Sequence, residues 1–198
     1  MIHVYGIVEE LRELPQLAGV NDAPLERKQV GRLELVVSDD PGGEVTQDAV
    51  LRHAEVVEEL MNRSRAVLPA QFGRPFDDEG ELAAAIRTKA PELERGLERV
   101  RGCVEFGLRV VGPTDGAEAA SGTEYMRARL EQERALATID EPLAELARAS
   151  TSNRAYLVPA ENVAAFRAAV ERLQAEHPEL TIVCTGPWPP YSFGAESA

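Results

Sequence analysis

The chain has 198 residues, and its 34 acidic and 21 basic side chains give a formal net charge of −13. This charge argues against binding to nucleic acid or to anionic lipid heads, because both need basic residues to meet phosphate. An apolar fraction of 44% is typical of a globular protein with a hydrophobic core. No run of about 18 apolar residues occurs, so we expect no membrane-spanning helix. The opening MIHVYGIVEELRE lacks the pattern of a signal peptide, so we expect a cytoplasmic protein.

Known catalytic and cofactor motifs are absent from the sequence. There is no GxGxxG, Walker loop, HExxH or GxSxG, so the sequence predicts no enzyme, no catalytic residue and no cofactor. Three histidines and no CxxC make a metal site unexpected. The two cysteines, Cys103 and Cys184, lie in strand-like stretches, and we expect buried free thiols rather than a disulfide.

The N-terminal part predicts two strands separated by a loop. Residues 2–8 (IHVYGIV) are rich in β-formers, and residues 9–24 are polar with several turn formers. Residues 30–38 alternate apolar and polar side chains, which indicates a strand with one buried face. A turn follows over residues 39–44.

Two long helices flank a short strand. The first is expected over residues 47–65, with Thr46 as its N-cap. Its apolar stripe comprises Val50, His53, Val57, Leu60, Met61 and Ser64. Residues 66–72 then form a short apolar strand.

Asp78 and Glu81 form a capping box that opens a second helix, expected to reach about residue 101. The buried stripe of this second helix comprises Leu82, Ile86, Ala90, Leu93, Leu97 and Val100. Pro91 predicts a kink or break near Ala90.

The C-terminal part repeats the alternation of strands and helices. Residues 103–111 (CVEFGLRVV) predict a strand, and residues 112–122 predict a flexible linker. A capping box at Ser121 and Glu124 opens a third helix towards residue 149, with a break expected at 140–142. A strand (154–159), a helix (161–175) and a strand (180–185) complete the pattern.

These elements indicate an α+β protein with two lobes. We expect an N-terminal mixed α/β domain over residues 1–102. We expect a C-terminal domain over residues 103–198, which includes the proline-rich aromatic tail. The strand-helix-strand-helix-strand order of the second domain predicts a modified ferredoxin-like fold that lacks one strand.

Two side chains in the first lobe have more than one interpretation. His53 lies on an apolar helix face, where a core histidine with a satisfied hydrogen bond competes with an acid/base or ligand role. Arg74 follows Phe72 and Gly73 at the end of a strand, where it binds either an acidic partner or a carboxylate of its own chain.

The tail TGPWPPYSF combines prolines with three aromatic residues. The prolines exclude a helix or a central strand, yet the aromatic side chains must pack on something. They either cover the chain's own core or form an apolar surface for a partner, and both can hold together.

Four stretches together resemble the gas vesicle protein F/L family. They are His53–Met61, Ala66–Phe76, Arg101–Val110 and, as the most specific, Thr185–Phe193. The resemblance implies a non-enzymatic protein with two α/β lobes, the second a modified ferredoxin-like fold. It also implies an accessory or minor structural role in gas vesicle assembly, with the gas vesicle shell protein and other accessory proteins as partners.

We therefore hypothesise that the cleft between the lobes and the aromatic tail form an apolar groove for a partner protein. The partner-binding residues in this hypothesis are Phe72, Arg74, Trp188, Pro189, Pro190, Tyr191 and Phe193. The competing hypothesis is a small-molecule-binding or self-associating regulatory module, because ferredoxin-like folds host many functions.

Overall fold

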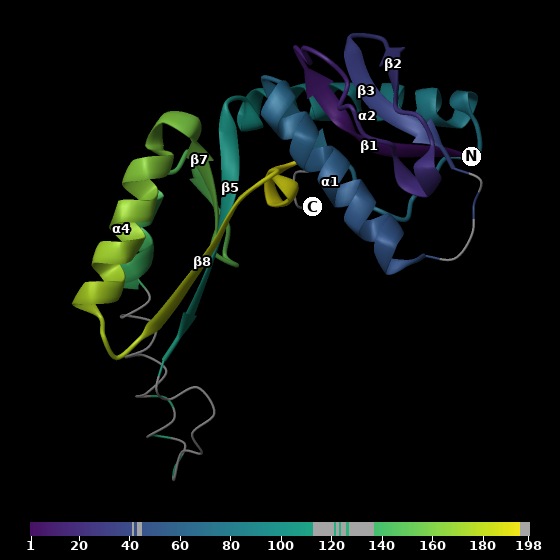
Figure 1. The fold of residues 1–198 in the computed structure, drawn as a ribbon. Coiled ribbons are helices and arrows are strands. Elements are labelled where there is room, and N and C mark those ends of the chain that lie inside the picture. The colour runs from purple at the N-terminus through teal and green to yellow at the C-terminus, as the bar shows by residue number, and fades with distance from the viewer. Residues whose placement is uncertain are drawn as a thin grey trace. The chain divides into compact units, whose positions relative to one another are not determined.

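The computed structural model describes residues 1–40, 42, 45–112, 121, 123, 126 and 137–194. The chain forms two compact units (Figure 1). The first comprises Met1–Cys103 and the segment that begins at Trp188, and the second comprises Val104–Pro187. The sequence had assigned the tail to the C-terminal domain, whereas the tail packs in the first unit because Phe193 is buried there and a short helix docks on the second long helix.

The first unit is built on a four-stranded sheet with the strand order β2-β3-β1-β4. Each neighbouring pair of strands is antiparallel. The elements are β1 (Ile2–Glu9), η1 (Val20–Asp22), β2 (Glu26–Val30), β3 (Leu33–Asp39), α1 (Gln47–Arg63), β4 (Ala66–Pro69), α2 (Glu79–Val100) and η3 (Tyr191–Phe193).

Helices α1 and α2 cover opposite faces of this sheet (Figure 1). Successive side chains of a strand point to opposite faces. Val8 of β1 packs in one cluster with Val56 and Leu60 of α1, whereas the adjacent Ile7 lies on the α2 face. Both faces of β1 are therefore buried, which explains why its sequence is an almost continuous apolar run.

Local signals set the start of both helices as predicted. The Thr46 hydroxyl accepts a hydrogen bond from the Ala49 amide at 3.1 Å, which caps α1. The Asp78 carboxylate accepts from the Glu81 amide at 2.9 Å, and the Glu81 carboxylate accepts from the Asp77 amide at 2.7 Å. These capping predictions are confirmed. They could be made from the sequence because each cap involves residues close in sequence.

Two details of the helices differ from prediction. Val50 is exposed, because the buried face of α1 is centred one residue earlier, on Ala49 and His53. Helix α2 continues through Pro91 without interruption. At 100° per residue, Pro91 points away from Ile86 and Leu93, so the missing backbone hydrogen bond falls on the solvent side.

The sequence missed the hairpin of β2 and β3. Residues 30–38 were expected to be one strand, but Val30 ends β2 and Leu33 begins β3. Gly31 makes the turn with a φ of +62°, a conformation that costs glycine nothing. Strand β2 (ERKQV) lies at the edge of the sheet and is charged, so it carries no apolar alternation.

The second unit has the βαββαβ order of a ferredoxin-like fold. Its sheet has the strand order β6-β7-β5-β8, and α4 lies along the strands (Figure 1). Within the described ranges its elements include β5 (Cys103–Val111), β6 (Ala149–Ser150), β7 (Ala155–Pro159), η2 (Ala160–Asn162), α4 (Val163–Glu176) and β8 (Thr181–Trp188). The expectation of a missing strand is corrected by β6, which is only two residues long and leaves no sequence pattern.

Helical residues 137–144 separate β5 from β6, so the break expected at 140–142 is wrong. Ile139 and Leu143 in this segment are fully buried, so packing holds the helix. The predicted linker and the capping box with Glu124 involve residues outside the described ranges.

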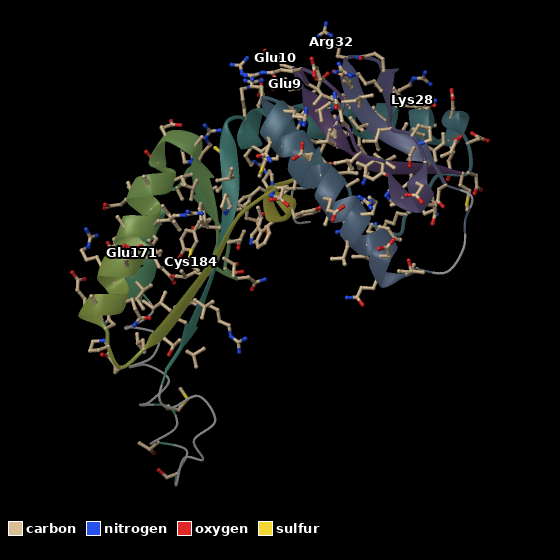
Figure 2. All side chains as sticks on the ribbon, in the orientation of Figure 1. Glu9, Glu10, Lys28, Arg32, Glu171 and Cys184 are labelled. Carbon is tan, nitrogen blue, oxygen red and sulfur yellow. The ribbon has the colours of Figure 1, made fainter. Side chains whose placement is uncertain are left out.

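The core of the second unit lies between the sheet and its helices. The rings of Phe106 and Phe166 stack with their centroids 5.1 Å apart. Cys184 packs against this core from β8, while Glu171 points outward from α4 (Figure 2). Both cysteines are free thiols, but only Cys103 is buried as expected, because Cys184 is partly exposed.

A candidate partner-binding groove

A groove with a volume of about 380 Å³ opens in the first unit, on the face of the sheet that α2 covers. We call it the α2 groove. Its walls come from β1, β4 with the loop that follows, α2 and η3. Its apolar lining comprises Val4, Ile7, Leu68, Phe76, Ile86 and Leu93. The hypothesis placed a groove between two lobes, whereas all residues of the α2 groove belong to the first unit.

A backbone irregularity in β1 shapes the floor of the groove. The register of β1 against β3 shifts between Val4 and Gly6. A Cβ atom on Gly6 would lie only 2.7 Å from the Leu68 carbonyl oxygen, so only glycine allows β4 to approach this closely. Val4, Gly6 and Ile7 consequently all line the groove.

A second close approach holds the tail beside the groove. A Cβ atom on Gly96 would lie 3.1 Å from both the Gly194 carbonyl oxygen and a Leu68 methyl group. Because Gly96 has no side chain, η3 can dock on α2 at this point, and Phe193 is only 5% exposed. Tyr191 remains 44% exposed and lines the groove.

The phenol of Tyr191 is uncharged at neutral pH. Partial burial raises the pKa of Tyr191 to about 12. Within the described part of the chain its hydroxyl has no hydrogen-bond partner. Tyr191 therefore offers an incoming chain an apolar ring and a hydroxyl group that can donate or accept a hydrogen bond.

Three charged side chains also line the groove. Arg74 belongs to the loop after β4, and Lys89 and Glu92 belong to α2. Among the described residues, neither Arg74 nor Lys89 has an ion-pair partner within 4.0 Å. Among these residues Arg74 therefore has no carboxylate for the structural salt bridge that the sequence left open.

The predicted tail residues divide into two groups. Pro189, Pro190 and Phe193 are buried and anchor the tail in the first unit. Tyr191 lines the groove, whereas Trp188 is 48% exposed and is not among the lining residues. Both sequence-based interpretations of the tail thus have support, from different residues.

Phe72 lies away from the α2 groove although it is close to Arg74 in sequence. Its ring contacts those of His3 and His53, with centroids 5.5 Å and 5.6 Å away. It also lines a second cavity, of about 320 Å³, beside His3 and Thr46. Phe72 packs with the α1 face of the core.

His53 is a core histidine, 3% exposed, with two hydrogen bonds. Its Nε2 lies 3.0 Å from the Ala70 carbonyl oxygen, which can only accept, so Nε2 carries the hydrogen. Nδ1 of neutral His53 then accepts from Nε2–H of His3 at 2.8 Å. Burial, followed by the nearby His3, lowers the pKa of His53 to about 4. Burial also lowers the pKa of His3, against the opposing effect of Asp40.

Sequence reasoning missed the part of the groove that α2 contributes. Ile86 and Leu93 were assigned to a core stripe, and Lys89 was assigned no role. The signal was the position of Lys89 three residues after Ile86 and four before Leu93, which places all three on one helix face. Nothing local indicated that η3 would lie beside this face.

The described residues contain neither a metal-binding cluster nor a membrane-spanning helix. Within those ranges, no three His, Cys, Asp or Glu side chains come close enough to hold a metal ion. Likewise, no described helix combines the length and the apolar character needed to cross a membrane.

The family model described as gas vesicle synthesis protein GvpL/GvpF matches residues 1–150 and 121–195 of the chain. The chain belongs to the GvpL/GvpF family. The resemblance carried by the four sequence stretches is thereby confirmed. As a GvpL/GvpF family protein, it takes part in gas vesicle formation.

Curated relatives of this GvpL/GvpF protein carry both names. Gas vesicle protein F1 of Halobacterium salinarum is 31% identical over 97% of this chain and 92% of its own length. Gas vesicle protein F2 of the same organism is 32% identical over 100% of this chain and 95% of its own. Gas vesicle protein L of a Streptomyces species is 26% identical over 91% of this chain and 87% of its own.

Two crystal structures share the fold. GvpF from Anabaena sp. PCC7120 superposes with a TM-score of 0.83 at 17% identity, covering 100% of this chain and 97% of that one. GvpF from Microcystis aeruginosa gives a TM-score of 0.77 at 16% identity, covering 98% and 99%. The α+β fold class predicted from sequence is confirmed.

Proposed function

We propose that this GvpL/GvpF protein binds an apolar segment of the gas vesicle shell protein, or of another gas vesicle protein, during assembly. The observation that carries the proposal is the α2 groove, which has an apolar floor and the exposed ring of Tyr191 at its side. Aromatic side chains presented on a rigid scaffold are favoured at protein interfaces, because they bury much area at low entropic cost.

The groove is suited to this role because regular structure holds most of its walls. Strands β1 and β4 and helix α2 supply the apolar floor. A site built on packed strands and helices loses little conformational entropy when a ligand binds. Its volume of about 380 Å³ accommodates a few apolar side chains of an incoming chain rather than a whole folded domain.

The physical need for such a site follows from the product. A shell whose inner surface faces gas is made of subunits that expose apolar surface before they assemble, and exposed apolar patches aggregate. A carrier with a net charge of −13 remains dispersed while it covers such a patch. The proposal places the protein in the cytoplasm and on the growing gas vesicle, and it assigns no catalytic step or cofactor.

The test measures binding of the purified shell protein from the same genome to single variants. Leu93→Ser and Tyr191→Ala remove apolar surface from the groove, and we expect each to weaken binding by roughly tenfold. Leu51→Ser is the matched control for Leu93→Ser, because Leu51 is an exposed leucine on α1 outside the groove. Trp188→Ala is the matched aromatic control. Both controls should bind within about twofold of wild type.

The proposal fails if the double variant Leu93→Ser/Tyr191→Ala binds the shell protein as tightly as wild type. Circular dichroism must show that the double variant is still folded. If the other purified gas vesicle proteins also bind wild type and the double variant equally, no partner uses the groove.

A further inference from the structure

The charged lining of the α2 groove has a sign opposite to that of the chain. Arg74 and Lys89 supply two positive charges and Glu92 supplies one negative charge. The chain as a whole has a net charge of −13, yet no carboxylate of the described residues pairs with either cation. Elsewhere in the first unit, arginines do find carboxylates, as Arg101 does with two hydrogen bonds to Glu9.

Other charged side chains of the first unit form ion pairs within the unit itself. Arg65 bonds Glu10 at 2.8 Å, and Glu9 and Glu10 lie together at the end of β1 (Figure 2). Lys28 of β2 pairs with Glu79 at the start of α2. Within the described ranges Arg74 and Lys89 have no such structural partner, and we take their charges to be available to a bound molecule.

Helix geometry places Lys89 beside the apolar floor. Ile86, Lys89 and Leu93 follow the i, i+3, i+7 spacing of one helix face. Lys89 is exposed while Ile86 is buried, so its ammonium group lies at the edge of the groove. Arg74 reaches the same groove from the loop after β4.

We infer that the α2 groove selects a polypeptide segment that carries a carboxylate next to its apolar side chains. Arg74 and Lys89 bind the carboxylate while Leu93 and Tyr191 contact the apolar residues. An arginine suits this role because its planar guanidinium binds both oxygens of a carboxylate. Glu92 adds selectivity, because it repels a segment whose second acidic residue would lie next to Glu92. This inference rests on the proposed function and specifies its partner.

The expected contribution of the charges is selectivity and association rate more than affinity. Exposed charges at the rim of an interface act through a high-dielectric solvent and are screened by salt. Reversing one such charge should weaken binding by roughly tenfold at low ionic strength and much less at high ionic strength. In contrast, the loss of affinity that follows from removing apolar contacts should be the same at high salt.

The probe is a set of overlapping synthetic peptides that cover the shell protein from the same genome. Affinities of the peptide that binds best are measured at about 0.05 M and about 0.5 M salt. Arg74→Glu and Lys89→Glu are compared with Arg87→Glu, a matched control on an exposed α2 residue that does not line the groove. We expect roughly tenfold losses for the two groove variants and less than about twofold for Arg87→Glu at low salt.

A double-mutant cycle identifies the carboxylate. Each acidic residue of the peptide is replaced in turn by its amide. One replacement should weaken binding to wild type by roughly tenfold and leave binding to Arg74→Glu or Lys89→Glu almost unchanged.

The outcomes separate this inference from the proposed function. If Leu93→Ser weakens peptide binding by roughly tenfold while both charge reversals behave like Arg87→Glu, the carboxylate inference is wrong and the proposed function survives. If the charge reversals strengthen binding, the occupant carries a cation that meets Glu92, and the inference is again wrong. If no groove variant affects binding of any peptide, both are wrong.

Discussion

The buried histidine pair predicts a loss of stability in mild acid. His53 has a folded-state pKa of about 4, below the ordinary value of 6.5, because burial disfavours its charged form. The unfolded chain therefore takes up this proton at a higher pH than the folded chain does. Neutral His53 therefore makes its full contribution to the folding free energy above pH 6.5. This contribution is lost progressively as the pH falls from 6.5 towards 4.

The magnitude follows from the size of the shift. One pKa unit corresponds to about 1.36 kcal/mol. The shift of His53 then removes about 2 kcal/mol of folding free energy at pH 5 and about 3 kcal/mol below pH 4. The lowered pKa of His3 acts in the same direction, and Asp40, 3.8 Å from His3 Nδ1, opposes it. Tyr5, which stacks on His53, is uncharged in this range because burial raises its pKa.

The assay compares wild type with His53→Gln by urea unfolding at pH 7, 6 and 5, followed by circular dichroism. Glutamine keeps an amide donor for the Ala70 carbonyl group but cannot take up a proton. We expect wild type to lose about 2 kcal/mol more than the variant between pH 7 and pH 5. Equal losses in the two proteins would show that His53 is not buried as a neutral ring. The variant's own lower stability at pH 7 does not affect this comparison.

Three substitutions test the packing that supports the groove and the two cores. Gly6→Ala should destabilise the fold by about 2 kcal/mol or more in chemical unfolding, because its Cβ would lie 2.7 Å from the Leu68 carbonyl oxygen; unchanged stability would contradict the close approach. Thr46→Ala should cost about 1 kcal/mol through loss of the α1 cap, and Thr46→Ser should restore most of it. Tyr156→Phe removes a 2.7 Å hydrogen bond to Asp140 and should lower the unfolding free energy by about 1–2 kcal/mol; a thermal midpoint equal to wild type would argue against that bond.

Local sequence signals predicted the helices and their caps well. The Thr46 cap and the Asp78–Glu81 capping box depend on residues within four positions, so the sequence contains the whole signal. Strand β6 escaped prediction because two residues cannot show a period of two.

The candidate site could be predicted only in part, because it joins segments that are distant in sequence. The sequence identified Arg74 and Tyr191, and the structure places both on the α2 groove. It also grouped Phe72 with Arg74, but Phe72 packs against His53 on the other face of the sheet. The docking of η3 depends on the absence of a side chain at Gly96. This contact joins segments that are distant in sequence, so no local pattern predicts it.

Site-specific photocrosslinking in cells that assemble gas vesicles gives the most direct test of the central claim. A photoreactive phenylalanine analogue replaces Tyr191 in one strain and the exposed Leu51 in another. The account predicts that irradiation links the position of Tyr191, and not that of Leu51, to the shell protein or to another gas vesicle protein. Equal crosslinking from both positions, or none from position 191 while vesicles still form, would contradict it.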